Sequence, residues 1–172
     1  MSTNWKAGIM GVWLLLGATS CSHIQEMLRC SPEVEVSAAE AQLRKNIVSY
    51  ALDYQGTRYK YAGRSPQTGF DCSGFVHYVF QAFNHDLPPV SRAQETEGRK
   101  IDVGDTQAGD LLFFRKSKAG QVFHVALVVK NTNEGITVVH STTSRGVVME
   151  NISQSSYWKN KITTACDVLR SR

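Results

Sequence analysis

Gly69-Phe70-Asp71-Cys72-Ser73-Gly74-Phe75 is the stretch that decides the fold, because it places a cysteine directly after a residue that starts helices. Asp71 is a good helix cap, and apolar residues then recur at helical spacing as far as Phe83. A thiol at the first helical position meets N–H groups without intrahelical acceptors and the positive end of the helix dipole. The sequence therefore predicts a helix from Cys72 to about Asn84, with a thiol pKa below the ordinary value of about 8.5.

Around this stretch, helical patterns come first and strand patterns come later. Ser37-Ala38-Ala39-Glu40 reads as a capping box that opens a helix through about Tyr54. Residues 85–109 form a long polar connection with few strand signals, of the kind that is often functional. The strand candidates are residues 111–114, 122–130, 136–140 and 146–150. This order favours the α+β class with an antiparallel sheet.

The hairpin formed by the second and third strand candidates predicts where two histidines point. If Lys130 and Ile136 are opposed across a five-residue turn, then the numbers of all opposed residues have an even sum. His124 and His140 then lie on the same face of the sheet as diagonal neighbours, about 7–8 Å apart at the backbone. A turn of four or six residues would instead place them on opposite faces.

Together, Cys72, His124 and His140 suggest nucleophilic catalysis. One imidazole must accept the thiol proton, and a second polar group must hold that imidazole in the productive tautomer. Each residue alone is more often structural, but their combination in an exported domain favours a working set. The other histidines are His23, His77 and His85. Of these, only His85 offers an alternative partner for Cys72, and that pairing leaves the hairpin histidines unexplained.

The first twenty residues read as an export signal. Lys6 precedes an apolar run over residues 7–17, and small residues precede Cys21. This arrangement resembles a bacterial lipoprotein signal, which implies lipidation of Cys21 and anchoring at the periplasmic face of the outer membrane. Ordinary secretion and an uncleaved anchor remain the alternatives. The predicted organisation is a signal peptide (1–20), a lipid-proximal tether (21–36) and a catalytic domain (37–172).

Charge and cysteine usage narrow the functional classes further. Without residues 1–20, which carry only Lys6, the net charge falls from +4 to +3. This mild balance, without a basic run or a known motif, gives no argument for nucleic-acid binding. No CxxC or HExxH spacing occurs, so neither a zinc site nor a cofactor is expected. Cys30 and Cys166 could form a disulfide in an oxidising compartment or remain two separate thiols.

With these motifs, the chain resembles the NlpC family of bacterial cell-wall cysteine endopeptidases. The resemblance spans about residues 43–168 and rests on short motifs. They are Gly56-Thr57-Arg58-Tyr59 with Ala62-Gly63, Phe70-Asp71-Cys72-Ser73-Gly74-Phe75, Pro89-Val90-Ser91-Arg92-Ala93-Gln94, Ala108-Gly109-Asp110-Leu111, Phe123-His124-Val125-Ala126 and Val139-His140-Ser141. The family implies a papain-like fold in which N-terminal helices, with the catalytic cysteine at a helix N-terminus, pack on an antiparallel sheet. It also implies hydrolysis of amide bonds in peptidoglycan stem peptides or crosslinks.

The resemblance also implies individual roles. Cys72 matches the nucleophile, His124 the base and His140 the third polar residue. Tyr59 matches the tyrosine that completes the oxyanion hole, and Asp71 and Ser73 match positions that contact the stem peptide. One departure is Ala62, which replaces a usual glycine and requires that backbone position to tolerate a Cβ.

Two other functions remain in view. The same fold could carry an amidase or acyltransferase, or it could serve as a non-catalytic lipoprotein that binds the envelope. A degenerate binding module is expected to lose the cysteine or a histidine, whereas this chain has all three. The expected partners are therefore peptidoglycan stem peptides and, through Cys21, a membrane.

Overall fold

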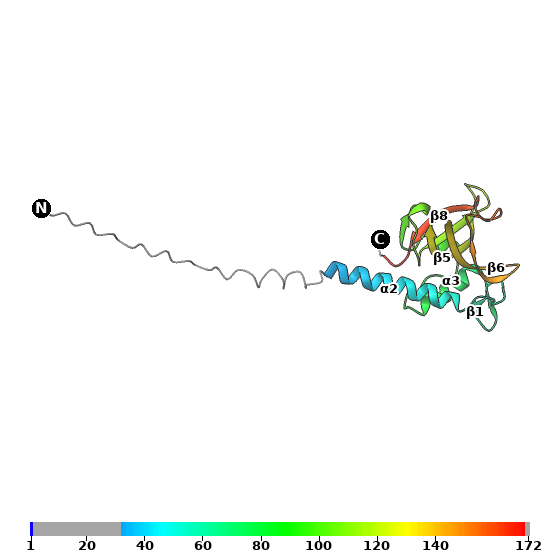
Figure 1. Ribbon diagram of the computed structural model, residues 1–172. Coiled ribbons are helices and arrows are strands. Elements are labelled where there is room, and N and C mark those ends of the chain that lie inside the picture. Colours follow the sequence, from blue (N-terminus) through cyan, green and yellow to red (C-terminus); the bar gives the residue numbers. More distant parts are fainter. Residues whose placement is uncertain (2–31, 171–172) are drawn as a thin grey trace. The chain divides into compact units, whose positions relative to one another are not determined.

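The computed structural model describes residue 1 and residues 32–170, with side chains from residue 37 onward (Figure 1). Residues from Val36 onward form one compact unit. Its first helix, α2 (Pro32–Leu52), begins upstream of the predicted capping box, so Ser37 lies inside the helix and the predicted start is wrong. Proline suits the first turn of a helix, where its missing N–H costs no hydrogen bond.

A six-stranded antiparallel sheet dominates the unit. Its spatial order is β3-β8-β4-β5-β6-β7. The four predicted strands correspond to β4 (Leu111–Arg115), β5 (Val122–Thr132), β6 (Gly135–Thr142) and β7 (Gly146–Asn151). Sequence reasoning missed β3 (Arg99–Ile101) and β8 (Ile162–Asp167), which complete one side of the sheet. Helices packed on an antiparallel sheet confirm the α+β prediction.

Short elements interrupt the segments that read as loops. The connection over residues 85–109 contains α4 (Ser91–Gln94), β3 and the 3-10 turn η1 (Val103–Asp105). A small hairpin of β1 (Arg64–Ser65) and β2 (Gly69–Phe70) leads into the Cys72 helix.

The sheet buries both of its faces. Helices α2 and α3 (Cys72–Gln81) pack on one face (Figure 1), against side chains that include Phe113, Val125 and Val139. The opposite face carries a second apolar cluster. Its members include Phe114, Ala126, Val138, Ile152 and Trp158. Because side chains alternate along a strand, His124 and His140 belong to this second face.

The β5–β6 hairpin places the two histidines on the same face, as predicted, but its turn and its register near the turn differ from the prediction. Thr132 opposes Gly135, so the turn has two residues instead of five, and Lys130 opposes Thr137 instead of Ile136. A register shift at Val129 then adds one residue to β5, which makes Val128 oppose Val138. A bulge of this kind changes the register by one position. The two departures cancel, and the even sum holds beyond the bulge.

Several predictions fall on residues outside those described: the signal peptide, the tether up to residue 31, Cys21 and Cys30. Cys166 is buried on β8, with its Sγ 3.2 Å from the Glu95 carbonyl oxygen. The Cys30–Cys166 disulfide therefore stays a prediction. None of the helices among the described residues has the length and hydropathy that crossing a membrane requires.

Candidate active site

Cys72 is the first residue of α3, as the sequence predicts. Asp71 caps the helix in an extended conformation, and its Oδ1 accepts a hydrogen bond from the Gly74 N–H at 2.6 Å. The helix ends at Gln81, three residues before the predicted end, and Asn84 adopts a left-handed conformation with a φ of +62°. The cap fixes the Cys72 backbone at the point where the helical N–H groups converge.

Close backbone contact positions the start of α3 against the preceding loop. A Cβ at Gly74 would lie 2.1 Å from the Gly63 carbonyl oxygen, so only glycine fits there. The Asp71 N–H donates to that same carbonyl at 3.1 Å. Ala62 has a φ of +54°, so this position does hold a Cβ in the left-handed region that glycine prefers.

Ser141 connects the cysteine loop to the histidine strand. Its hydroxyl donates to the Phe70 carbonyl oxygen at 2.7 Å, and both residues are buried. Ser141 follows His140, and Phe70 lies two residues before Cys72. This bond therefore links the backbone just before Cys72 to the strand that carries His140. The sequence motif contained Ser141 but did not indicate this role.

The two hairpin histidines form a buried pair. His124 Nε2 lies 2.9 Å from His140 Nδ1, and the ring centroids are 5.0 Å apart. His140 is fully buried and His124 almost so. The structure thus brings the two predicted residues into direct hydrogen-bond contact.

Aromatic rings enclose this pair. Trp158 stacks on His124 with centroids 4.5 Å apart and an interplanar angle of 25°, and it also contacts His140 at 5.2 Å. Phe114 meets the His124 ring edge-on at 5.4 Å. Sequence reasoning missed Trp158, for which the only signal was an aromatic pair, Tyr157-Trp158, after the predicted strands.

A carboxylate extends the pair on its far side. Glu150 Oε1 lies 2.7 Å from His140 Nε2 and accepts a second hydrogen bond from Arg145 Nη2 at 2.5 Å. Sequence reasoning missed this contact too. The parity argument applied to the β6–β7 hairpin would have found it, because an odd-numbered loop puts Glu150 and His140 on one face.

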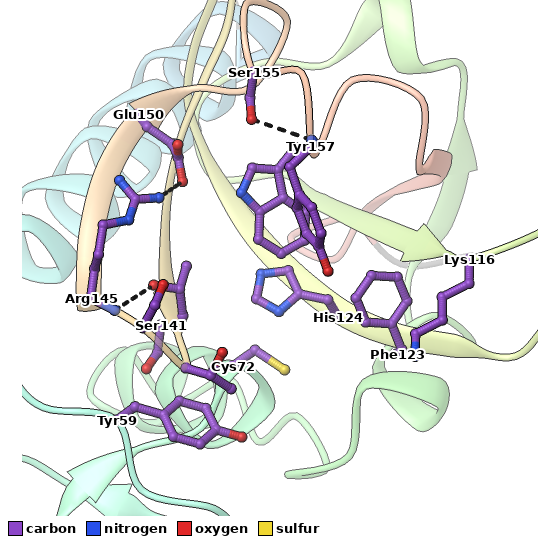
Figure 2. A pocket seen from close by; sticks show the side chains of 14 residues that line it. Tyr59, Cys72, Lys116, Phe123, His124, Ser141, Arg145, Glu150, Ser155 and Tyr157 are labelled. Atoms are coloured by element: carbon purple, nitrogen blue, oxygen red, sulfur yellow. Dashed lines mark hydrogen bonds and ion pairs between the residues drawn. The ribbon is translucent and has the colours of Figure 1, made fainter.

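A cavity of about 560 Å³ opens onto the site. Tyr59, Cys72 and His124 line it, together with Arg145 and Glu150, and Figure 2 shows the Cys72 side chain and the His124 ring at the same cavity. Asp71 and Ser73 are not among the lining residues. Ser73 donates hydrogen bonds to Asp71 and to the Pro89 carbonyl, each at 3.2 Å.

The electrostatics differ from the sequence prediction of a lowered thiol pKa. Burial raises the pKa of Cys72 to about 11; the N–H of Val125 and those at the helix start lower it only in part. Burial, followed by the neighbouring His140, holds the pKa of His124 well below its usual value. The resting site is therefore a neutral thiol beside a neutral imidazole, so the proton must move as the sulfur attacks.

The remaining titratable groups support this arrangement. Burial, with Cys72 and Asp71 nearby, raises the pKa of Tyr59, so its hydroxyl stays a hydrogen-bond donor. The hydrogen bond from His140, opposed by burial but aided by Arg145, lowers the pKa of Glu150. Among the described residues, no three His, Cys, Asp or Glu side chains group as a metal site.

Known proteins resemble this chain in sequence and in fold. It is 34% identical over 157 residues to the gamma-DL-glutamyl hydrolase of Bacillus subtilis (strain 168), covering 90% of this chain but only 35% of that protein. It is 31% identical over 149 residues to the murein DD-endopeptidase MepS/murein LD-carboxypeptidase of Escherichia coli (strain K12), covering 86% of this chain and 75% of the relative.

A solved structure is similar to this chain in fold as well as in sequence. The crystal structure of the NlpC/p60 domain of the peptidoglycan hydrolase SagA superposes with a TM-score of 0.59 at 32% identity. The match covers 72% of this chain and 97% of that domain. The NlpC/P60 family model itself matches residues 56–167, the segment that carries Tyr59, Cys72 and both histidines. This chain therefore belongs to the NlpC/P60 family.

Proposed function

We propose that this chain is a cysteine peptidase that hydrolyses amide bonds in peptidoglycan stem peptides or crosslinks. The observation that carries the proposal is the buried His124–His140 hydrogen bond of 2.9 Å, beside a helix-start cysteine in the same cavity. Membership of the NlpC/P60 family supports it. So do the names of the relatives, which include a murein endopeptidase and a peptidoglycan hydrolase.

The arrangement performs acyl transfer in two steps. The Cys72 sulfur attacks the scissile carbonyl carbon while His124 takes the thiol proton, and His124 then gives that proton to the departing amine. Water attacks the resulting thioester, with its proton passing through His124 to restore the thiol. His140 holds the His124 ring, in the place that an amide or carboxylate takes in related triads.

We assign the oxyanion contact to the Cys72 N–H and the Tyr59 hydroxyl. A backbone bridge between Tyr59 and Phe70 ties the tyrosine to the segment just before Cys72, and the tyrosine lines the cavity. Preorganised donors of this kind stabilise the negative charge that develops on the carbonyl oxygen.

We also retain Asp71 and Ser73 as proposed stem-peptide contacts. Asp71 uses Oδ1 for Gly74 and Ser73, so Oδ2 is the oxygen that we assign to the peptide. Ser73 would have to exchange its bond with the Pro89 carbonyl for a bond to substrate.

We further propose that Cys21 is lipidated after removal of residues 1–20, and that residues 21–36 tether the catalytic domain (37–172) to the periplasmic face of the outer membrane. The apolar run followed by small residues and a cysteine supports this proposal. Expression of Cys21→Ala beside the parent chain tests it. The parent should fractionate with membranes and carry the mass of a lipid, and the variant should do neither.

Digestion of purified peptidoglycan by the full chain, with mass spectrometry of released fragments, tests the peptidase. Cys72→Ala should release no stem-peptide products while melting at the parent temperature, and His85→Gln is the matched control that should remain active. Cys72-dependent products would also identify the cleaved bond. If a well-folded parent releases no products, the peptidase proposal fails, and acyl-transfer and peptidoglycan-binding assays then distinguish an amidase or acyltransferase from a binding lipoprotein.

A further inference from the structure

We propose that Glu150 is a positioning residue that selects the tautomers of both histidines, so that His124 presents an unprotonated Nδ1 to Cys72. The inference rests on the proposed function only for its effect on the reaction rate. The tautomers can be read without any substrate, so the two proposals can fail separately.

The Glu150 carboxylate can only accept hydrogen bonds. Its Oε1 lies 2.5 Å from Arg145 Nη2 and 2.7 Å from His140 Nε2. A guanidinium has donors and no acceptor, so Oε1 is an acceptor in the first bond. An ionised carboxylate has no proton to donate, so His140 Nε2 must carry the hydrogen of the second bond.

The tautomer of His140 determines the tautomer of His124. A neutral imidazole carries one N–H, so a proton on His140 Nε2 leaves its Nδ1 as an acceptor. His124 Nε2 lies 2.9 Å from that Nδ1 and must therefore be the donor. His124 then has its lone pair on Nδ1, the ring nitrogen that remains available to Cys72, which lines the same cavity.

Without Glu150, the His–His hydrogen bond forms equally well in the opposite sense. His140 Nδ1–H would donate to His124 Nε2, and the single N–H of His124 would be on Nδ1. A protonated Nδ1 cannot accept the thiol proton of Cys72. Both senses satisfy the buried bond, so the bond alone does not choose between them. The carboxylate on the far side of His140 makes the choice.

The fold brings Glu150 into place with its charge intact. His140 opposes Val148 on β7, so Glu150 lies two positions further along the same face. Exposure rises from 0% at His140 to 20% at Glu150 and 50% at Arg145. The chain of polar groups thus begins in the core and ends near solvent, where a carboxylate stays ionised at low cost.

The decisive measurement is the ¹⁵N spectrum of histidine-labelled full chain, with resonances assigned through His124→Gln and His140→Gln. An unprotonated ring nitrogen resonates far from a protonated one. In the parent, the unprotonated nitrogen should be Nδ1 in both rings. In Glu150→Leu, the signals should show both tautomers in exchange. Glu150→Gln, whose amide oxygen can still accept from His140, should keep the parent tautomers.

Activity provides the second measurement. The kcat of Glu150→Leu should fall about tenfold or more with KM nearly unchanged, because a catalytic histidine in the wrong tautomer loses much of its rate. Glu150→Gln should lie between the parent and Glu150→Leu. Glu134→Leu removes the same charge from an exposed turn and is the matched control that should keep the parent rate.

Parent tautomers in a folded Glu150→Leu would overturn the proposal, whatever its activity. Arg145→Met provides an independent check by the same spectra, because it leaves the carboxylate to accept from His140. It should keep the parent tautomers, and a tautomer change there would show that Arg145, and not Glu150, makes the choice.

Discussion

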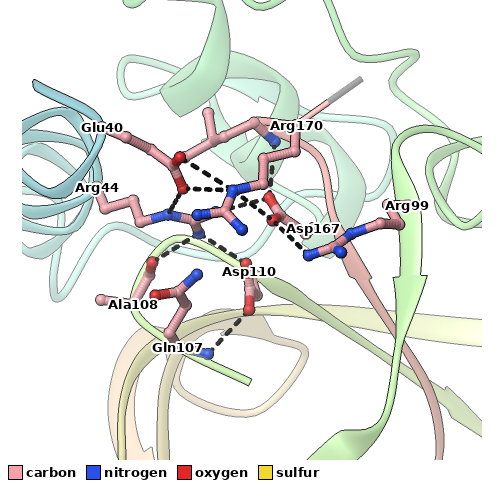
Figure 3. A network of polar contacts seen from close by, with 9 residues as sticks. Glu40, Arg44, Arg99, Gln107, Ala108, Asp110, Asp167 and Arg170 are labelled. Carbon is pink, nitrogen blue, oxygen red and sulfur yellow. Dashed lines mark hydrogen bonds and ion pairs between the residues drawn. The ribbon is translucent and has the colours of Figure 1, made fainter. Parts of the chain in front are cut away.

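Two buried polar networks stabilise different parts of this molecule and are built from different chemistry. The first joins α2 to the ends of β4 and β8. Arg44, only 4% exposed, bonds to Asp110 Oδ1 and to Asp167 Oδ1 at 2.7 Å each, and to Glu40 at 2.8 Å (Figure 3). Arg99 and Arg170 lie 3.7 Å and 3.8 Å from Asp167 Oδ2, which accepts no hydrogen bond among the described residues.

The second network runs from His124 through His140 to Glu150, and Cys72 lines the same cavity as His124. Its buried members are imidazoles, which can exchange protons, and its carboxylate and guanidinium, Glu150 and Arg145, lie nearer the solvent. In the Arg44 network, burial opposes the charge, but bonds to Asp110, Glu40 and Asp167 outweigh it and raise the arginine pKa further. A permanently ionised arginine holds three elements together, whereas imidazoles can pass a proton. The same fold therefore uses a buried arginine for stability and buried histidines for catalysis.

Arg44→Met should have the largest effect on stability. The change leaves Asp110 and Asp167 buried without their cation, which costs about 3–5 kcal/mol of unfolding free energy. Denaturant unfolding of this variant beside Lys45→Met, an exposed neighbour on the same helix, measures the loss. The rate per folded molecule should stay at the parent value. A loss no greater than that of Lys45→Met would contradict the role of this network.

His140→Ala should have the largest effect on rate after loss of the nucleophile. Removing the group that orients His124 should lower kcat about a hundredfold, or roughly 2.7 kcal/mol. His140→Gln or His140→Asn should retain more activity, because an amide can accept from His124 Nε2–H and donate to Glu150. Steady-state kinetics of the three variants checks the order. Parent activity in His140→Ala would remove this residue from the catalytic set.

Ser141→Ala should lower the stability more mildly than Arg44→Met. The variant leaves the buried Phe70 carbonyl without its 2.7 Å hydrogen bond, which costs about 1–3 kcal/mol. Thermal unfolding beside Thr143→Ala, an exposed position in the next turn, measures this cost. Equal melting temperatures for the two variants would show that the Ser141 bond does not hold the cysteine loop.

The smallest effect should be a pH dependence that arises from His124. Its pKa is lower in the folded protein than in the unfolded chain, so the unfolded state binds more protons below about pH 6.5. Stability should therefore fall as the pH falls from about 6.5, by at most about 1.4 kcal/mol per pH unit for this group. Unfolding measured at pH 7.5 and 5.5 should show a smaller change in His124→Gln. An equal change in the variant would assign the proton uptake to other groups.

Sequence reasoning predicted the active-site elements better than the elements that support them. The start of α3 followed from Asp71 and Cys72, because a cap is a local signal. The facing of the histidines was predicted correctly although the turn and the pairing of Lys130 were wrong, because the bulge at Val129 compensates for the shorter turn. Bulges leave no reliable mark in a single sequence, so this agreement depended on two cancelling errors.

The missed features depend on contacts between distant segments. The sequence around Arg44 gives no sign of its ion pairs, because its partners Asp110 and Asp167 lie 66 and 123 residues away. The lowered thiol pKa was wrong because the local helix start was visible in sequence, whereas the burial that outweighs it was not. Trp158 and β8 fall in a segment whose periodicity is weak, so only the folded sheet reveals their place.

The stacking of Trp158 on His124 gives the protein a built-in optical reporter. The chain has three tryptophans, and the other two, Trp5 and Trp13, lie in the predicted signal peptide. An indole in face contact with an imidazole changes its emission when that imidazole gains a proton, because the cation interacts with the ring. In a chain from which residues 1–20 have been removed, as proposed above, fluorescence from this single tryptophan should therefore follow the protonation of His124, and stopped-flow emission should time its proton transfers during turnover.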